Sequence, residues 1–435
     1  GRSVVATRSG DDQRGDLLVI DPSTGAVRAI ASPRADGIAY AVDTLPDGTM
    51  LVLATNARGF AQLAKVDLAT GASVFVGPGD WDVDDADVAA DDGSVVYARN
   101  VHGESEVGLA PRADFEHVRV LARGGVVESV GIDRTARTIT VLREASDHPS
   151  EIVSLDPSNG AVTVRVASDV AGVQVDRLAR ARRITLASFD GTPVDVFVWS
   201  PPVARLGTPP PLVVHVHGGP NAQTRGAFSP TVQALAEAGF VVASVNYRGS
   251  TGYGRAFEDL NNRDWGGGDL RDVVHVVHEL ARTREVDPRR VGIYGGSYGG
   301  YLTLRAVTAA PDVWRAAVDM YGMPDLAADF RLTADRFGSW YLTEMGDPDG
   351  AEASLYRDRS PIHALDRVRA SLLVLQGAND SNVPAAESAA LVAALRARGR
   401  TVDQVVYPGE GHGFTHREHR VDAIERTVRF FVNAL

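Results

Sequence analysis

The stretch Gly-Gly-Ser-Tyr-Gly-Gly at residues 295–300 restricts the fold of this chain more than any other part of the sequence. It follows a strand-like run at residues 290–294, and this order is typical of a strand that turns sharply into a helix. Glycines two positions before and two positions after Ser297 fit such a turn because they carry no Cβ. Ser297 is therefore a candidate nucleophile, although a Gly-rich turn with a purely structural serine would give the same motif.

Two further strand-like runs lead into polar loops downstream of Ser297. Residues 372–375 lead to Asp380, and residues 402–407 lead to His412. In α/β-hydrolases the nucleophile, the acid and the base follow in this chain order, each on a loop at the carboxyl end of a parallel strand. The sequence therefore predicts an α/β-hydrolase domain with Ser297, Asp380 and His412 as its catalytic triad.

Each member of this predicted triad has a catalytic role and an alternative. His412 would take the proton of Ser297 as general base, and Asp380 would hold the imidazole in the required tautomer. Asp380 could instead cap the helix that is expected to begin near Pro384. The competing bases His416 and His419 lie in a charged stretch and are expected to be solvated.

A tetrahedral intermediate also needs hydrogen-bond donors for its negatively charged oxygen. The backbone N–H of Tyr298, which follows the nucleophile, is one candidate. The run at residues 211–217 reads as a strand that ends at a glycine pair, and the backbone N–H of Gly219 is the second candidate. An ordinary Gly-Pro turn is the alternative interpretation at Gly219.

Four motifs together resemble the prolyl oligopeptidase family, and the resemblance covers essentially the whole chain. They lie at residues 217–220, 246–254, 295–300 and 360–362. The chain is most similar to the acylaminoacyl-peptidase branch, which contains acylaminoacyl peptidases, aminopeptidases and relatives that cleave puromycin. His217 stands where the prolyl-endopeptidase and dipeptidyl-peptidase branches usually carry a tyrosine oxyanion donor, which favours a backbone donor here. Gln376 stands where a histidine often begins the acid-loop motif.

The resemblance implies a β-propeller before the hydrolase domain, and the sequence contains matching repeats. Related ten-residue segments begin at residues 18, 64 and 153, and residues 107–114 fill the gap in a period of about 45 residues, the length of a four-stranded blade. We expect four blades in a propeller domain at residues 1–178, followed by the hydrolase domain at residues 179–435.

Family propellers usually have seven blades, so the resemblance implies that part of this one is missing at its N-terminal side. A missing segment, or a second copy of the chain, would then cover the exposed strand edges. The run at residues 80–87 begins like a calcium loop, but Asp85 stands where that loop needs glycine and Asp91 where it needs glutamate. We interpret this run as a solvated acidic loop of a blade.

Composition excludes several classes of function. With 56 acidic and 44 basic residues the formal charge is −12, which argues against nucleic acid as a partner. The absence of cysteine excludes disulfides, thiol chemistry and cysteine-ligated zinc. No apolar run is long enough to span a membrane. We expect no metal, no cofactor and a cytoplasmic location.

Aromatic residues are concentrated between the nucleophile and the acid, where hydrolases insert the walls of their pockets. We predict that the substrate pocket is formed by Phe330, Phe337, Trp340, Tyr341 and Glu344. The aromatic rings would hold an apolar P1 side chain, and Glu344 or another carboxylate would bind a free ammonium group. The alternatives are that these rings belong to the core, or that a nearby arginine binds a carboxylate or acyl oxygen.

The sequence predicts a serine peptidase that removes residues from the amino end of short peptides or aminoacyl amides through an acyl-enzyme. Two alternatives remain at this point. One is a carboxylesterase that uses the same triad, and the other is a propeller-based binding scaffold with a vestigial hydrolase.

Overall fold

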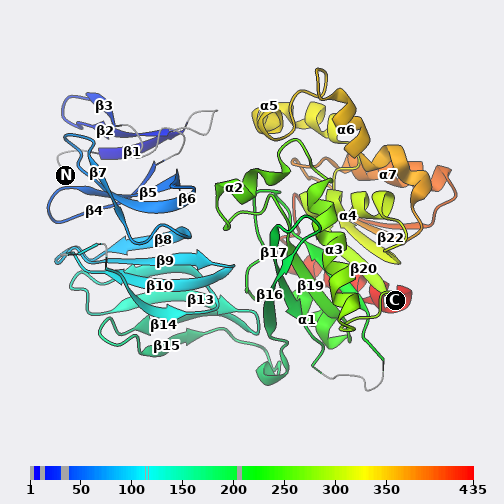
Figure 1. Ribbon diagram of the computed structural model, residues 1–435, viewed down its shortest axis with the longest axis horizontal. Helices are drawn as coiled ribbons and strands as arrows, with labels where there is room; N and C mark the ends of the chain where they lie inside the picture. The colour runs from blue at the N-terminus through cyan, green and yellow to red at the C-terminus, as the bar shows by residue number, and fades with distance from the viewer. Residues whose placement is uncertain (1–3, 10–14, 31–38, 113, 116, 203–207) are drawn as a thin grey trace. The chain divides into compact units, whose positions relative to one another are not determined.

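The computed structural model of the chain describes residues 4–9, 15–30, 39–112, 114–115, 117–202 and 208–435 (Figure 1). These residues form two compact units. Unit 1 contains residues 1–173, 225–228 and 251–256, and unit 2 contains residues 174–224, 229–250 and 257–435. The main change of unit lies between Val173 and Gln174, and because two short segments return to unit 1, a single cut does not separate the units. The boundary near Leu178 stays a prediction from the sequence.

Unit 1 contains four antiparallel sheets in which consecutive strands pair with each other. The first is β1 (Val4–Ser9), β2 (Gly15–Ile20) and β3 (Val27–Ile30); the second is β4 (Ala39–Thr44), β5 (Met50–Ala57), β6 (Phe60–Val66) and β7 (Ser73–Val76). The third is β8 (Asp82–Val88), β9 (Val95–Val101), β10 (Glu104–Ala110) and β11 (Arg119–Arg123); the fourth is β12 (Val126–Ile132), β13 (Ile139–Ala145), β14 (His148–Leu155) and β15 (Val162–Ala167). These sheets confirm the prediction of four propeller blades.

The sequence repeats correspond to the turn between the last two strands of a blade. In three blades an aspartate carbonyl accepts the N–H of a glycine four positions later at 2.8 Å; the pairs are Asp21–Gly25, Asp67–Gly71 and Asp156–Gly160. Each aspartate carboxylate also accepts a backbone N–H inside its own turn. The same hydrogen bonds therefore form this turn in three of the four blades, which explains why this part of the repeat can be recognised in the sequence.

The interpretation of residues 80–87 as a solvated loop is wrong, because most of them form β8. Asp85 Oδ2 accepts the N–H of Val130 at 2.8 Å, and Asp87 Oδ2 accepts the N–H of Ile132 at 2.8 Å. Both donors lie on β12 of the next blade. The acidic side chains thus join two neighbouring blades.

Unit 2 is built on an eight-stranded sheet with the order β16-β17-β19-β18-β20-β21-β22-β23. The strands are β16 (Ala181–Ala187), β17 (Pro193–Trp199), β18 (Leu212–Val216), β19 (Val241–Asn246), β20 (Val291–Gly296), β21 (Ala316–Met320), β22 (Ser371–Gly377) and β23 (Val402–Tyr407). Strands β18 to β23 run parallel, whereas β16 and β17 pair antiparallel. The carboxyl ends of the parallel strands therefore meet at one edge.

Helices cover both faces of this sheet. The described helices are α1 (Pro230–Glu237), α2 (Arg255–Glu258), α3 (Gly268–Arg282), α4 (Tyr298–Ala309), α5 (Leu326–Glu344), α6 (Ala353–Arg359), α7 (Ala385–Ala397) and α8 (Arg417–Ala434), with 3-10 turns η1 (Val175–Arg177), η2 (Asp259–Asn261) and η3 (Pro361–Arg367). Apolar residues of α1 and α8 form one core with the sheet, and those of α3, α4 and α7 form the other. The central strands are apolar because both of their faces are buried.

This arrangement confirms the predicted fold class of an α/β-hydrolase with an N-terminal propeller. Among the residues that the structure describes, no helix combines the length and apolar character needed to cross a lipid bilayer.

Candidate active site

Ser297 lies at the sharp turn between β20 and α4. Its backbone adopts φ 59° and ψ −123°, a conformation that residues with a Cβ rarely adopt. The flanking glycines are required by close packing, since a Cβ on Gly295 would lie 2.4 Å from the carbonyl oxygen of Val216. A Cβ on Gly299 would lie 2.2 Å from the same oxygen. The motif thus allows β20 and α4 to pack tightly against β18 while the turn presents the serine.

His412 and Asp380 form a direct pair. His412 Nδ1 lies 2.9 Å from Asp380 Oδ2 and 3.1 Å from Oδ1. The Asp380 side chain is fully buried, and its Oδ1 also accepts the N–H groups of Asn382 and Val383 at 2.9 and 3.0 Å. Asp380 therefore orders the start of its own loop and contacts the histidine at the same time. Gln376, which begins the acid-loop motif, directs its Nε2 toward Asp380 Oδ2 at 3.4 Å.

The loop that carries His412 is fixed by a buried carboxylate, Glu410. This carboxylate accepts the N–H groups of Thr415 and His416 at 2.8 and 2.9 Å. It also lies 2.8 Å from Nδ1 of His419. His416 and His419, the alternative bases, therefore belong to the surroundings of Glu410, whereas His412 lies at the pocket described next.

A cavity of about 400 Å³ brings the predicted residues together. It is lined by Gly219, Asn221, Ser297, Met323, Asp329, Phe337, Trp340, Tyr341, Asn382, Val383 and His412. The candidate nucleophile, the candidate base and the glycine of the predicted oxyanion site thus share one pocket. Such a concave site with apolar walls and a few polar groups is typical of a substrate-binding pocket.

The loop around Gly219 is held by the side chains beneath it. Gly219 has φ 113°, and a Cβ on it would lie 2.6 Å from the N atom of Asn221. The ring of His217 stacks on Tyr247 with 4.3 Å between centroids, and the Tyr247 hydroxyl donates to the His217 carbonyl oxygen at 2.7 Å. Burial lowers the pKa of His217 to about 3, so its ring is neutral at physiological pH. The loop is therefore held by a stacking contact between two uncharged rings and by the hydrogen bond from Tyr247.

Tyr298 is the first residue of α4, and its side chain points away from the pocket. Its buried hydroxyl donates to Asp269 Oδ2 at 2.5 Å, and burial raises the pKa of Asp269 to about 6. The N–H groups of Gly266 and Leu270 also donate to this carboxylate. Asp269 thus anchors the first turn of α4. The amino end of a helix favours negative charge, and this turn forms the amino end of α4.

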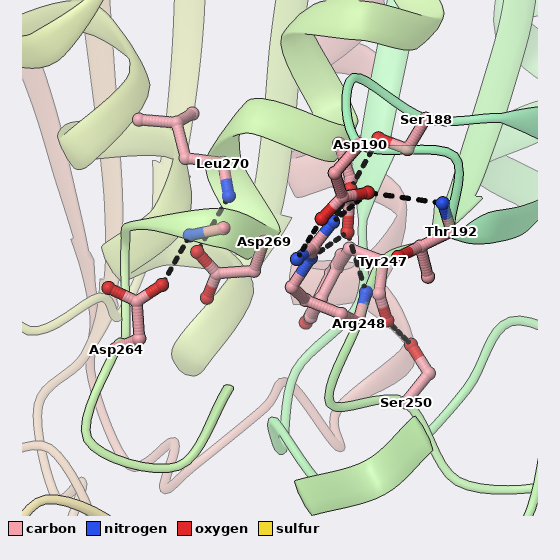
Figure 2. Close-up of polar contacts among 11 residues, drawn as sticks. Ser188, Asp190, Thr192, Tyr247, Arg248, Ser250, Asp264, Asp269 and Leu270 are labelled. Carbon is pink, nitrogen blue, oxygen red and sulfur yellow. Dashed lines mark hydrogen bonds and ion pairs between the residues drawn. The ribbon is translucent and has the colours of Figure 1, made fainter. Parts of the chain in front are cut away.

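Arg248 ties the loop after β19 to two other segments, as Figure 2 shows. Its guanidinium donates to Asp272 Oδ2 and Oδ1 at 2.9 and 2.8 Å, and to both oxygens of Asp190 at 2.9 and 3.1 Å. Asp272 is fully buried and also accepts the hydroxyl of Ser188 at 2.5 Å. Tyr247 precedes Arg248 in the chain, so this network also supports the Tyr247 ring, which packs under the Gly219 loop.

We expect Arg248→Met to lower the free energy of unfolding by about 3–5 kcal/mol, since it leaves the Asp272 carboxylate buried without its partner. Urea unfolding of the purified protein measures this loss. Arg282→Met is the matched control, because Arg282 is an exposed arginine paired with Glu279, and its loss should cost less than about 1 kcal/mol. The double variant Arg248→Met, Asp272→Asn should recover part of the stability. Equal stability of the Arg248 and Arg282 variants would contradict this account.

The structure separates the residues that were predicted to form the substrate pocket. Phe337, Trp340 and Tyr341 line it, whereas Phe330 and Glu344 are not among the lining residues. The ring of Phe330 is partly buried and packs against the core, with its centroid 5.8 Å from that of the Tyr341 ring, and Glu344 is 5% exposed. Tyr298 also lies outside the lining, which is compatible with a role for its backbone N–H alone.

The two arginines between the nucleophile and the acid also lie outside the pocket lining. Arg331 pairs with Asp349, and Arg336 has its Nε 3.8 Å from the carboxylate of Asp335. Both arginine side chains are exposed. The structure therefore gives no support to the alternative in which one of them receives an acyl oxygen.

Five lining residues were not predicted from the sequence; they are Asn221, Met323, Asp329, Asn382 and Val383. Four of them lie just after Gly219, β21 or Asp380, on loops at the carboxyl edge of the sheet. The rule that parallel strands end at one edge could have found these four. Asp329 lies on α5 and not on a loop that follows a parallel strand, so this rule could not have found it.

Comparisons with known proteins agree with this architecture. Residues 227–435 match the sequence profile described as "Prolyl oligopeptidase family". The chain is 31% identical over 393 residues to dipeptidyl aminopeptidase BIII of Pseudoxanthomonas mexicana, covering 86% of this chain and 56% of that protein. It is 30% identical over 226 residues to the acylamino-acid-releasing enzyme of Arabidopsis thaliana, covering 50% of this chain and 29% of that enzyme.

A solved structure is similar over nearly the whole chain. It is a puromycin-hydrolyzing peptidase of Mycobacterium tuberculosis, which aligns with a TM-score of 0.87 and 26% sequence identity, covering 98% of this chain and 66% of that one. This chain spans less than two thirds of the length of each of these three relatives.

Proposed function

We propose that this chain is a member of the prolyl oligopeptidase family, whose profile matches residues 227–435, and that it is a serine peptidase acting through Ser297, His412 and Asp380. One observation carries this proposal. Ser297 and His412 line the same pocket, and the second ring nitrogen of His412 lies 2.9 Å from the buried carboxylate of Asp380. A serine near a histidine that is oriented by an acid is the arrangement that activates a hydroxyl for attack on an amide.

The proposed reaction proceeds through an acyl-enzyme. Ser297 Oγ attacks the scissile carbonyl carbon while its proton moves to His412, and Asp380 stabilises the imidazolium that forms. The backbone N–H groups of Tyr298 and Gly219 donate to the oxyanion. The C–N bond then breaks, and the amine leaves with the proton from His412. In the second half of the reaction His412 takes a proton from water while the water oxygen attacks the acyl carbon, and the bond to Ser297 Oγ breaks as His412 returns the proton to that oxygen.

The proposed substrates are short peptides or aminoacyl amides cleaved from their amino end. The apolar walls of the pocket, formed by Phe337, Trp340 and Tyr341, suit an aromatic or aliphatic P1 side chain. The similarity to a dipeptidyl aminopeptidase, an acylamino-acid-releasing enzyme and a puromycin-hydrolyzing peptidase supports this choice. A cytoplasmic location stays a prediction from the sequence.

The test is parallel kinetics on matched substrates of the purified chain. Phenylalanine p-nitroanilide, acetylphenylalanine p-nitroanilide and phenylalanine p-nitrophenyl ester should all be offered, together with a fluorophosphonate that labels active serines. We expect amide hydrolysis and labelling at Ser297. Hydrolysis of the ester without any amide hydrolysis would support a carboxylesterase instead, and absence of labelling would remove the serine mechanism.

A further inference from the structure

Asp329 is the one carboxylate among the described lining residues of the pocket. It lies in the first turn of α5 and is only 2% exposed. Tyr341, at the other end of the same helix, donates its hydroxyl to Asp329 Oδ2 at 2.5 Å. The side chain is therefore fixed at the wall of the pocket that holds Ser297 and His412.

The second oxygen of this carboxylate has no partner. Asp329 Oδ1 is buried, and no described residue donates a hydrogen bond to it. A buried polar atom without a partner is costly, and a charged one is more so. Burial accordingly raises the pKa of Asp329 to about 6, so that the group is ionised at neutral pH but is poorly compensated. An unsatisfied acceptor at the pocket wall indicates that a donor arrives with the ligand.

The charges around Asp329 favour a cationic donor. Glu387, at the start of α7, is 4% exposed, and burial together with the nearby Asp329 and Asp325 carboxyls raises its pKa to about 8. Asp380 lies close enough to raise the pKa of Asp329 further, while His412 and Arg336 lower it. The Arg336 side chain is 39% exposed, so water screens much of its charge. The site is thus acidic and lacks a buried arginine or lysine among the described lining residues.

The walls strengthen this preference. Phe337, Trp340 and Tyr341 contribute aromatic rings to the pocket lining, and such rings attract cations through their π faces. An ion pair beside such apolar walls is stronger than one in bulk water, because the local dielectric constant is lower. A neutral apolar group would fill the same space but would leave Asp329 Oδ1 without a donor.

We propose that Asp329 binds a positively charged nitrogen of the substrate, carried by the residue whose carbonyl Ser297 attacks. This inference rests on the proposed peptidase function and names its substrate class. The nitrogen has two sources, the free α-ammonium of an amino-terminal residue and the ammonium of a lysine-like side chain. The sequence predicted that Glu344 or another carboxylate binds the ammonium group, and the geometry points to Asp329.

Four p-nitroanilides distinguish the two sources of the nitrogen. Each substrate is assayed at about pH 7 with the wild type, with Asp329→Asn and with Asp335→Asn. Phenylalanine and acetylphenylalanine p-nitroanilides differ in the α-ammonium, and acetyllysine and acetylnorleucine p-nitroanilides differ in the side-chain cation. We expect Asp329→Asn to lower kcat/KM for the cationic member of one pair by about 10- to 100-fold, and for its neutral counterpart by less than about threefold. Asp335→Asn removes an exposed charge from the same helix and should change neither rate.

Asparagine at position 329 can still accept the Tyr341 hydroxyl, and a melting curve checks that the variant is folded. Calorimetric binding of phenylalanine amide, acetylphenylalanine amide, acetyllysine amide and acetylnorleucine amide to the wild type needs neither catalysis nor a variant. Tighter binding of a cationic amide than of its neutral counterpart supports the proposal even if no amide is hydrolysed and the peptidase function fails. The proposal is overturned if the cationic and the neutral amide of each pair bind equally well. It is also overturned if Asp329→Asn still hydrolyses the substrates but loses kcat/KM equally on cationic and neutral ones.

Discussion

Ser297→Ala is expected to lower kcat by about 10,000- to 1,000,000-fold while leaving the protein folded. The substitution removes only Oγ, the atom that would form the bond to the substrate. An alanine keeps the Cβ that serine already has at φ 59°, so the turn between β20 and α4 accepts it without new contacts. Single-turnover kinetics on phenylalanine p-nitroanilide measure the loss, and an unfolding curve that matches the wild type shows that the fold is intact.

Two further variants make this result specific for the mechanism. His412→Ala alone, and combined with Ser297→Ala, should reduce kcat to about the same residual level, because members of one catalytic unit do not act additively. Ser339→Ala is the matched control, since Ser339 is an exposed serine on α5 outside the pocket lining. Turnover by Ser297→Ala within about tenfold of the wild type, in a sample free of other hydrolases, would contradict the proposed nucleophile.

Much of the site could be predicted because parallel strands align their ends. Once residues 290–294, 372–375 and 402–407 are recognised as strands, the loops that follow them must lie along one edge of the sheet. The structure accordingly brings Asp380 to His412, and places Ser297 at the same pocket. The blades were readable for a similar reason, since each repeated aspartate makes its hydrogen bonds within its own turn.

The residues that could not be assigned depend on packing between distant segments. Helix α5 carries aromatic and acidic residues on several faces, and its contacts with the core decide which face lines the pocket. For this reason Phe330 and Phe337 have similar surroundings in the sequence but different places in the structure. The acidic strand β8 is a second case, because its Asp85 and Asp87 carboxylates accept N–H groups of β12, more than forty residues away.

Asp380→Asn is expected to lower kcat by about 10,000-fold with little change in KM or in stability. The asparagine oxygen can still accept the N–H groups of Asn382 and Val383, so the loop should keep its shape. Its NH₂ group, however, would face Nδ1 of His412, which lies 2.9 Å from the carboxylate in the wild type. The imidazole would then carry its proton on the nitrogen that must accept one from Ser297, and fluorophosphonate labelling should slow in parallel with kcat. Asp403→Asn, an exposed aspartate on β23, is the matched control. A variant at position 380 that keeps more than about a tenth of the wild-type kcat would show that this carboxylate does not orient the base.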